Sequence, residues 1–365
     1  MTEQQILILR SDGNLWLATG PFGAQIPPYR VPVDGNVDLY GSFYALDSEE
    51  ILVCGSDGNL WLEQGPYGQV PLPDSPSYPP PPSARYQIDG NVAAYLAWPY
   101  YSEIPVDLYP EAIFVLGNDG NLWLESEFGS TNPTVPPPRN QIDGNVNEFM
   151  PMSLQEVFVL GSDGNLWHEF GPFGSVPLPQ CDGSNYGCRS HVASDIRTFY
   201  PVDSENVFLV DNNNDLSLAQ GSGWQDRTPV DGDVAGIFPI DPGTVYVLAR
   251  NGNLWLEKGP FGTVPLPLCS QTSGSSGGLP GLGSGLGCRT LVASEVSAFG
   301  LFPDDGGTYI VDGNLDLWQL GTPNVKIDVN VIDFQPVYSA DQSAGKHLRP
   351  RGPKRPVRVS PKAQR

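Results

Sequence analysis

A stretch close to DGNLW occurs six times in this chain of 365 residues. The copies begin at Ser11, Ser56, Asn118, Ser162, Asn251 and, in a drifted form, Asn314. A catalytic motif needs to occur once, whereas an architectural motif recurs in every structural unit. The chain is therefore expected to be a repeat protein built from copies of one small unit.

Aligning the copies also brings the segments around them into register. Each unit has an apolar β-type run, a turn, the LWLE run, a loop that often reads GPFG, a Pro-rich stretch and a closing segment. A further β-type segment, such as NVNEFMPM from Asn145, precedes the apolar run. The 42 Gly and 38 Pro suit short strands joined by turns, and no window shows helical periodicity. We expect four antiparallel strands in each unit.

The Asp-Gly step predicts the hairpin turn between the second and third strands of each unit. A two-residue type I′ loop needs positive φ at both positions, and Asp-Gly adopts these angles readily. The fifth unit has Asn213-Asn214 there, and Asn is the next most tolerant residue. This stretch resembles a calcium loop, but Leu216 and Ser222 stand where such a loop needs Gly and Glu.

The aligned tryptophan position counts seven units, which begin near residues 6, 51, 112, 157, 207, 245 and 309. It falls at Trp16, Trp61, Trp123, Trp167, Ser217, Trp255 and Trp318. The first unit lacks a first strand, and a first strand without successors follows Val329. The sequence therefore predicts an all-β, seven-bladed β-propeller over residues 1–340. Its blades are four-stranded and antiparallel, and the N- and C-terminal strands share one of them.

This pattern resembles the tectonin-type propellers and the bacterial sugar-binding propeller lectins. Their blades carry a similar VxVxGxDxxLWxx hairpin, and the likeness runs repeat by repeat from residue 1 to about 340. The resemblance implies the propeller fold and a lectin-like activity. The GPFG loop and the RxxID segment lie outside it, so no sugar-binding residue is carried across.

Two repeated residue types are expected to be structural. The tryptophans should fill the space between blades, because both faces of a blade are largely buried. A basic residue begins the closing segments, at Arg30, Arg85, Arg139, Arg189, Arg227 and Arg289, with Lys326 in the last unit. We expect these side chains to bind a carboxylate or carbonyl of a neighbouring strand or blade, the alternative being an anion-binding set.

The loops after LWLE offer the best ligand candidates. Equivalent aromatic residues stand there, at Phe22, Tyr67, Phe128, Phe173 and Phe261, with Trp224 near the same place in the fifth unit. An exposed aromatic face beside polar groups suits a sugar, so these loops can form a multivalent ligand platform. Alternatively, each ring plugs its own blade.

Four of the five cysteines bracket insertions at one architectural place in units four and six. The two stretches read VPLP…C…CR, and they predict disulfides Cys181–Cys188 and Cys269–Cys288. A site in which all four thiolates bind one metal is the alternative. Cys54, in the apolar run ILVCGS, is expected to be a buried small residue.

Charge separates the chain into a body and a tail. The last 20 residues hold eight of the 19 Lys and Arg, and no acid follows Asp341. The acidic body disfavours nucleic acid. The tail, 341–365, is expected to be disordered when free; the alternative is that it docks through 346–365 on an anionic surface, on a protein partner or on the chain's own acidic body. The disulfides favour an extracellular location, but the missing signal peptide favours the cytoplasm or non-classical export. No apolar run is long enough to cross a bilayer.

Nothing in the sequence indicates catalysis, a metal or a cofactor. The three histidines, His168, His191 and His347, have no metal-type partner at i+3 or i+4, and HExxH, GxSxG and P-loop motifs are absent. The expected function is non-enzymatic binding, first as a multivalent lectin for carbohydrate or glycoconjugate. The alternative is a structural or protein-interaction scaffold held by its basic tail and Cys-closed insertions.

Overall fold

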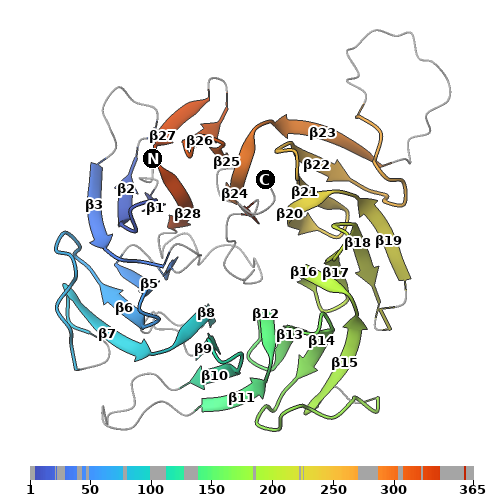
Figure 1. Cartoon of the computed structure of the whole chain (residues 1–365), viewed down its shortest axis with the longest axis horizontal. Coiled ribbons are helices and arrows are strands. Elements are labelled where there is room, and N and C mark those ends of the chain that lie inside the picture. Colours follow the sequence, from blue (N-terminus) through green and yellow to red (C-terminus); the bar gives the residue numbers. More distant parts are fainter. Residues whose placement is uncertain are drawn as a thin grey trace, which may run out of the picture. The chain divides into compact units, whose positions relative to one another are not determined.

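The protein, described here by a computed structural model, is a seven-bladed β-propeller whose strands pair into seven antiparallel sheets (Figure 1). The structure describes residues 5–20, 22, 29–38, 43–46, 49–76, 80–98, 112–126, 139–183, 186–221, 223–224, 226–269, 287–302, 307–321, 324–337 and 357–358. This confirms the predicted fold class and the four strands of each repeat.

The blades are numbered in chain order. Blade 1 contains β28 (Val331–Val337), β1 (Gln5–Arg10), β2 (Leu15–Thr19) and β3 (Tyr29–Asp34). Blades 2 and 3 contain β4 (Phe43–Ala45), β5 (Glu50–Cys54), β6 (Leu60–Gln64), β7 (Ala84–Asp89), β8 (Val92–Trp98), β9 (Ala112–Gly117), β10 (Leu122–Ser126) and β11 (Arg139–Asp143). Blade 4 contains β12 (Val146–Ser153), β13 (Glu156–Gly161), β14 (Leu166–Phe170) and β15 (Cys188–Ala193).

The remaining strands follow the same order. Blades 5 and 6 contain β16 (Ile196–Asp203), β17 (Asn206–Asp211), β18 (Leu216–Gln220), β19 (Asp226–Asp231), β20 (Val234–Asp241), β21 (Thr244–Ala249), β22 (Leu254–Lys258) and β23 (Cys288–Ala293). Blade 7 contains β24 (Val296–Phe302), β25 (Gly307–Asp312), β26 (Leu317–Leu320) and β27 (Val325–Asp328). A two-residue strand, β29 (Val357–Arg358), lies beside β24 and also contacts β20. The rest of the basic tail lies outside the described residues.

The chain forms two compact units. Unit 1 comprises Met1–Val159, His168–Ser190 and Phe299–Pro356 and holds blades 1, 2 and 3 whole. Unit 2 comprises Leu160–Trp167, His191–Ala298 and Val357–Arg365 and holds blades 5 and 6 whole.

Blade 1 is completed by both ends of the fold. β28 pairs antiparallel with β1, from Gln5 opposite Val337 to Arg10 opposite Val331 (red and blue in Figure 1). The predicted strand sharing is therefore confirmed, and β1 does not remain an open edge.

Apolar side chains from consecutive blades form the core of each unit. Between blades 1 and 2, Leu15 and Leu17 of β2 pack with Phe43 of β4 and Val53 of β5. In unit 2, Phe208 and Leu218 of blade 5 pack with Ile237 and Val247 of blade 6. Because side chains alternate along a strand, Ile51 and Val53 of β5 face the core shared with blade 1, and Leu52 and Cys54 face the core shared with blade 3.

The hairpin after the second strand differs from the predicted two-residue turn. In blade 1, Gly13 N donates to Arg10 O and Arg10 N to Asn14 O, which makes a three-residue loop. Only its last residue, Gly13, has positive φ, at 80°. This is a type I turn followed by a left-handed residue, which uses Asp-Gly as readily as the type I′ turn does.

All seven hairpins place a left-handed residue at this position. It is Gly in five blades, Asn214 in blade 5 and Leu315, with φ of 64°, in blade 7. The prediction that Asn replaces Gly in the fifth unit is confirmed at Asn214. A bulky Leu in this conformation is uncommon, because its Cβ crowds the following carbonyl.

The turns between blades are tied to these hairpins. Between blades 1 and 2, Asn36 has a φ of 63°, and Val37 N donates to Gly13 O in the hairpin of blade 1. Ser56 N, in the hairpin of blade 2, donates to Asn36 O. Backbone hydrogen bonds therefore run from one hairpin through the connecting turn to the next hairpin.

Candidate functional site

The aromatic loop residues lie against their blades. Tyr67 packs on the core between blades 1 and 2, Phe173 on the core of blades 3 and 4, and Phe261 on that of blades 5 and 6. All three rings are half-buried, as is Phe22. Phe128 lies outside the described residues.

Trp224 is only 4% exposed. Its indole therefore has almost no free face, which argues against its role as a sugar platform. The sequence could not show this, because burial of a loop residue depends on how the loop folds back on its blade.

The loops of blades 2, 4 and 6 share one conformation, and we call them the VPLP loops (65–75, 171–181 and 259–269). Each contains two cis X-Pro bonds at equivalent places. Each also returns beside the closing strand of its blade: Ser75 N donates to Arg85 O, and Cys181 N to Arg189 O. The loops are therefore fixed at both ends.

Each VPLP loop buries a leucine and exposes a valine. Leu72, Leu178 and Leu266 are at most 3% exposed, whereas Val70, Val176 and Val264 are 40%, 41% and 47% exposed. Two of these valines lie close to the connecting turn of the preceding blade. A Cβ placed on Gly35 would stand 3.2 Å from Val70 Cγ1, and one on Gly144 would stand 3.9 Å from Val176 Cγ1.

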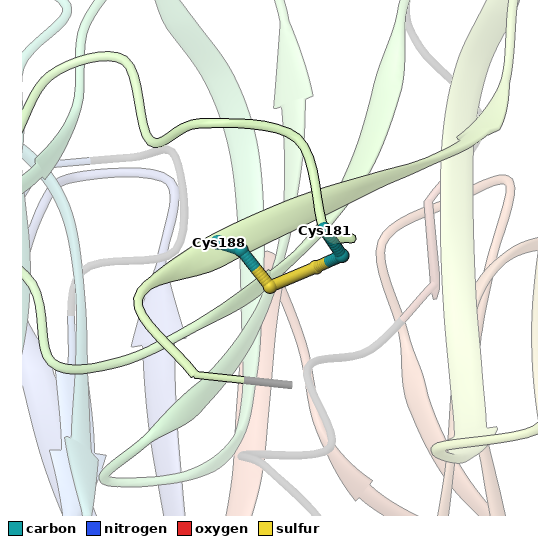
Figure 2. Close-up of a disulfide and its surroundings, with 2 residues drawn as sticks. All are labelled: Cys181 and Cys188. Atoms are coloured by element: carbon teal, nitrogen blue, oxygen red, sulfur yellow. A yellow bond between two sulfur atoms is a disulfide. The ribbon is translucent and has the colours of Figure 1, made fainter. Parts of the chain in front are cut away.

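Both predicted disulfides are present. Cys181 at the end of a VPLP loop joins Cys188 at the start of β15, as Figure 2 shows, and Cys269 joins Cys288 in the same way in blade 6. The Cα–Cα distance is 4.9 Å in both. The remaining cysteine, Cys54, is buried, as predicted.

The repeated tryptophans lie on the blade face toward the preceding blade, but all six are half-buried. Part of each indole is therefore open to solvent, and the prediction that the tryptophans fill the space between blades stays a prediction. A cation lies over several indoles: Arg85 Cζ is 4.1 Å from the centroid of Trp61, and Arg289 Cζ is 4.3 Å from that of Trp255. These distances are within the range of cation–π attraction.

Most of the repeated arginines bind the preceding blade, the structural role expected for them, whereas Arg85 pairs with Asp74 in the loop of its own blade. Arg139 donates to Asp89 at 2.9 Å, and Arg30 donates to Ile327 O at 3.1 Å. Arg227 contacts Val192 O at 3.5 Å. Lys326 was aligned with these arginines, but it pairs with Trp318. Lys326 is therefore equivalent to Gln87 of blade 2, which pairs with Trp61 in the same way.

Four glutamates were not singled out from the sequence. They are the last residues of LWLE or LWHE, namely Glu63, Glu125, Glu169 and Glu257, and each is at most 1% exposed. Each lies by an aspartate that ends the preceding closing strand; the pairs are Asp34–Glu63, Asp89–Glu125, Asp143–Glu169 and Asp231–Glu257. A signal was available, because the four Glu-bearing units each follow a unit whose closing segment ends in Asp.

Burial and the neighbouring carboxylate raise the pKa of these glutamates. The pKa of Glu63 and of Glu169 rises to about 9, and that of Glu125 and of Glu257 to about 8. Burial is the larger cause, because it disfavours the charged form. The nearby arginines lower these pKa values only in part.

Two histidines occupy architectural positions. His168 is 3% exposed, stacks on Phe158 and lies 2.8 Å from Glu156. His191 Nε2 lies 3.0 Å from Ser194 Oγ, which donates to Asn165. In blades 2 and 3 the position of His191 is held by a glutamine that donates directly to the equivalent asparagine, Gln87 to Asn59 and Gln141 to Asn121.

Two features are absent from the described residues. Within them, no group of three or more His, Cys, Asp or Glu is placed to hold a metal ion. The same part of the chain contains no helix with the length and apolar character that a membrane crossing requires.

Comparison with known proteins finds similarity in fold alone. No family model and no curated protein matches the sequence. Among solved structures, the WD40 β-propeller domain of Doa1 aligns at 11% identity and a TM-score of 0.49, covering 88% of each chain. Prp20p from Saccharomyces cerevisiae aligns at 10% identity and a TM-score of 0.44, covering 99% of this chain and 93% of that one. At these scores, the fold assignment rests on the strand pairing.

Proposed function

We propose that the protein is a non-enzymatic, multivalent binding protein: a scaffold that engages a partner protein through its VPLP loops. The observation that carries this proposal is the recurrence of one exposed valine, 40–47% accessible, at the same position of three loops. From the Gly to the last Pro of the VPLP stretch, none of the three loops carries a charge. The centres of protein interfaces are likewise depleted in charged residues.

Two physical properties favour these loops as binding elements. Each is held by a buried leucine and by backbone hydrogen bonds to the closing strand, so little conformational entropy remains to be lost on binding. Three copies also allow weak contacts to combine when a partner presents a repeated surface.

The test replaces the three exposed valines with aspartate, as Val70→Asp, Val176→Asp and Val264→Asp together. Proteins retained by the immobilised chain from its source are quantified by mass spectrometry, and a retained protein is purified for calorimetry. We expect the triple variant to lose the partner. A control adds the same charge at exposed turn positions, Ser11→Asp, Ser56→Asp and Ser162→Asp, and should keep it. Equal binding by the valine variant contradicts the proposal.

A lectin-like function is the second candidate. It is favoured by the recurrence of half-buried aromatic rings, Phe22, Tyr67, Phe173 and Phe261, in equivalent loops. A glycan array tests it, with Tyr67→Ala and Phe173→Ala as matched variants. Binding that falls in these variants supports a carbohydrate partner, and a silent array argues against it.

The basic tail offers another attachment to an anionic partner. Deletion of residues 341–365 separates this contribution from that of the VPLP loops. We expect a tail-dependent partner to be lost on deletion and a loop-dependent partner to be retained.

A further inference from the structure

We propose that four seams between consecutive blades each bind one proton, shared between a buried glutamate and the aspartate that ends the preceding blade. These protons hold the blades together near neutral pH and are released in alkaline surroundings. The inference is independent of the proposed binding function.

The geometry of the first seam shows the arrangement. Glu63 in β6 is fully buried, and Asp34 at the end of β3 is 3% exposed. Glu63 is the cross-strand partner of Arg85, and its carboxyl lies close enough to that of Asp34 for the two to interact electrostatically. The charged groups that face Glu63 are thus Asp34 and Arg85; Asp57 also faces Asp34, and Arg85 itself pairs with Asp74 of its own blade at 2.7 Å.

The same three groups meet in three other seams. Glu125 faces Asp89 and Arg139, Glu169 faces Asp143 and Arg189, and Glu257 faces Asp231 and Arg289. The arginines are only partly exposed, from 19% for Arg189 to 38% for Arg139. The same Glu–Asp–Arg group therefore recurs where four pairs of consecutive blades meet.

The charge in each seam requires a proton. Two ionised carboxyls and one guanidinium leave one negative charge in a place with little water, which is costly. No donor lies within hydrogen-bond distance of either carboxyl oxygen of Glu63 or Glu257 among the described residues. A protonated glutamate makes the three groups neutral as a whole and donates its O–H to the aspartate. One proton therefore removes the excess negative charge and also supplies the missing hydrogen bond.

Other seams of the same chain act as internal comparisons. Where the closing strand ends in Ala193, the facing position in the next blade is Ala219 and not glutamate. Asp328, which ends blade 7, faces two cations, Arg10 at 2.8 Å and Arg30 at 3.2 Å, and blade 1 has Ala18 at the glutamate position. Among the described residues, glutamate at this strand position therefore occurs only where an aspartate ends the preceding blade and a single arginine lies nearby.

The raised pKa values of the glutamates support this arrangement, because they keep the carboxyls protonated at pH 7. In the unfolded chain the same groups are ionised at pH 7. Unfolding should therefore release one proton from each pair.

The first experiment counts these protons. The protein is unfolded with denaturant at pH 7 in weak buffer, and the released protons are titrated. We expect Glu63→Gln and Glu169→Gln each to release one proton fewer than the wild type, because the amide of glutamine can still donate a hydrogen bond but has no proton that titrates. Glu295→Gln, at an exposed turn, should release the same number as the wild type.

A second measurement needs no variant. The infrared spectrum of the folded wild type at pH 7 should contain the C=O stretch of protonated carboxyls, which should disappear as the pH rises toward 10. If a glutamine variant fails to fold, the infrared spectrum of the wild type still tests the proposal. Absence of the band at pH 7, or equal proton release by Glu63→Gln, Glu169→Gln and the wild type, overturns the proposal.

Discussion

The guanidinium of Arg139 in β11 donates to Oδ2 of Asp89, at the end of the preceding blade, over 2.9 Å, and it lies 2.8 Å from Oε1 of Glu125 in its own blade. A single side chain thus links two sheets through the carboxyl group of each. Similar guanidinium positions recur along the chain, so cohesion between blades depends on polar contacts as well as on apolar packing.

We expect Arg139→Ala to lower the free energy of unfolding by about 1–2 kcal/mol, because it leaves two carboxyls without their cation. Arg139→Lys should recover part of this loss, since lysine keeps the charge without the planar fork. Denaturant unfolding measures both. Arg250→Ala is the control, because Arg250 and Asp233 are 3.9 Å apart and both well exposed. Equal losses at the two sites would show that the contact between blades contributes nothing.

Leu315 is expected to destabilise the hairpin of blade 7. Its φ of 64° suits glycine, which stands at this position in five blades. Leu315→Gly should raise the free energy of unfolding by about 1 kcal/mol, because it removes the strain of a left-handed leucine. Asn214→Gly should change it by only a few tenths, since Asn tolerates this conformation. A loss of stability in Leu315→Gly would mean that leucine contacts outweigh the strain.

A third disulfide should form in blade 2. Ser75 and Ala84 occupy the places of Cys181 and Cys188, and Ser75 N donates to Arg85 O as Cys181 N donates to Arg189 O. The variant Ser75→Cys with Ala84→Cys should lose both new thiols to a disulfide and gain about 2 kcal/mol of stability. Thiol titration and thermal unfolding check this, with and without reductant. Two titratable new thiols under oxidising conditions would contradict the equivalence of the loops.

The buried glutamates set the pH dependence of stability. Their pKa values are near 4.5 in the unfolded chain and about 8–9 in the fold, so their contribution is complete below pH 4.5 and is lost as the pH rises to 8–9. Within that window each pair should lower the free energy of unfolding by about 1.4 kcal/mol for each unit of pH increase. Carboxylates that are stabilised in their ionised form have the opposite effect, because they favour the fold at higher pH. Denaturation curves from pH 5 to 9 should show a smaller decline for Glu257→Gln. If stability declines with pH equally in Glu257→Gln and the wild type, Glu257 does not carry the proton.

The fold could be predicted because the repeat supplied its own alignment. Seven tryptophan-type positions fixed the number of blades, and the lone strand after Val329 showed how blade 1 is completed. The disulfides followed from the same alignment, since the cysteines stood beside matching flanks in two units. Repetition thus gave long-range information that a single copy lacks.

The details that failed depend on contacts between neighbouring blades. Asp-Gly fits more than one hairpin type, so the turn was assigned wrongly. The arginines that lie over Trp61 and Trp123 were not foreseen, because a contact between side chains of different strands is not visible in the repeat. Lys326 was misaligned although the sequence held a reference: where a closing segment with an arginine ends in Asp, the arginine stands four residues before it, whereas Lys326 stands two before Asp328, in agreement with its pairing with Trp318.

The pairing of β28 with β1 has a consequence for synthesis of the protein. The ribosome makes β1 before the other strands of the propeller, but β28, the partner of its open edge, is complete only when Val337 has been added. A nascent chain can pair β1 with β2 early, but the other edge of β1 stays open while the remaining blades are made, which invites association with other chains. Chaperone dependence during translation is the expected cost of joining the first and last strands.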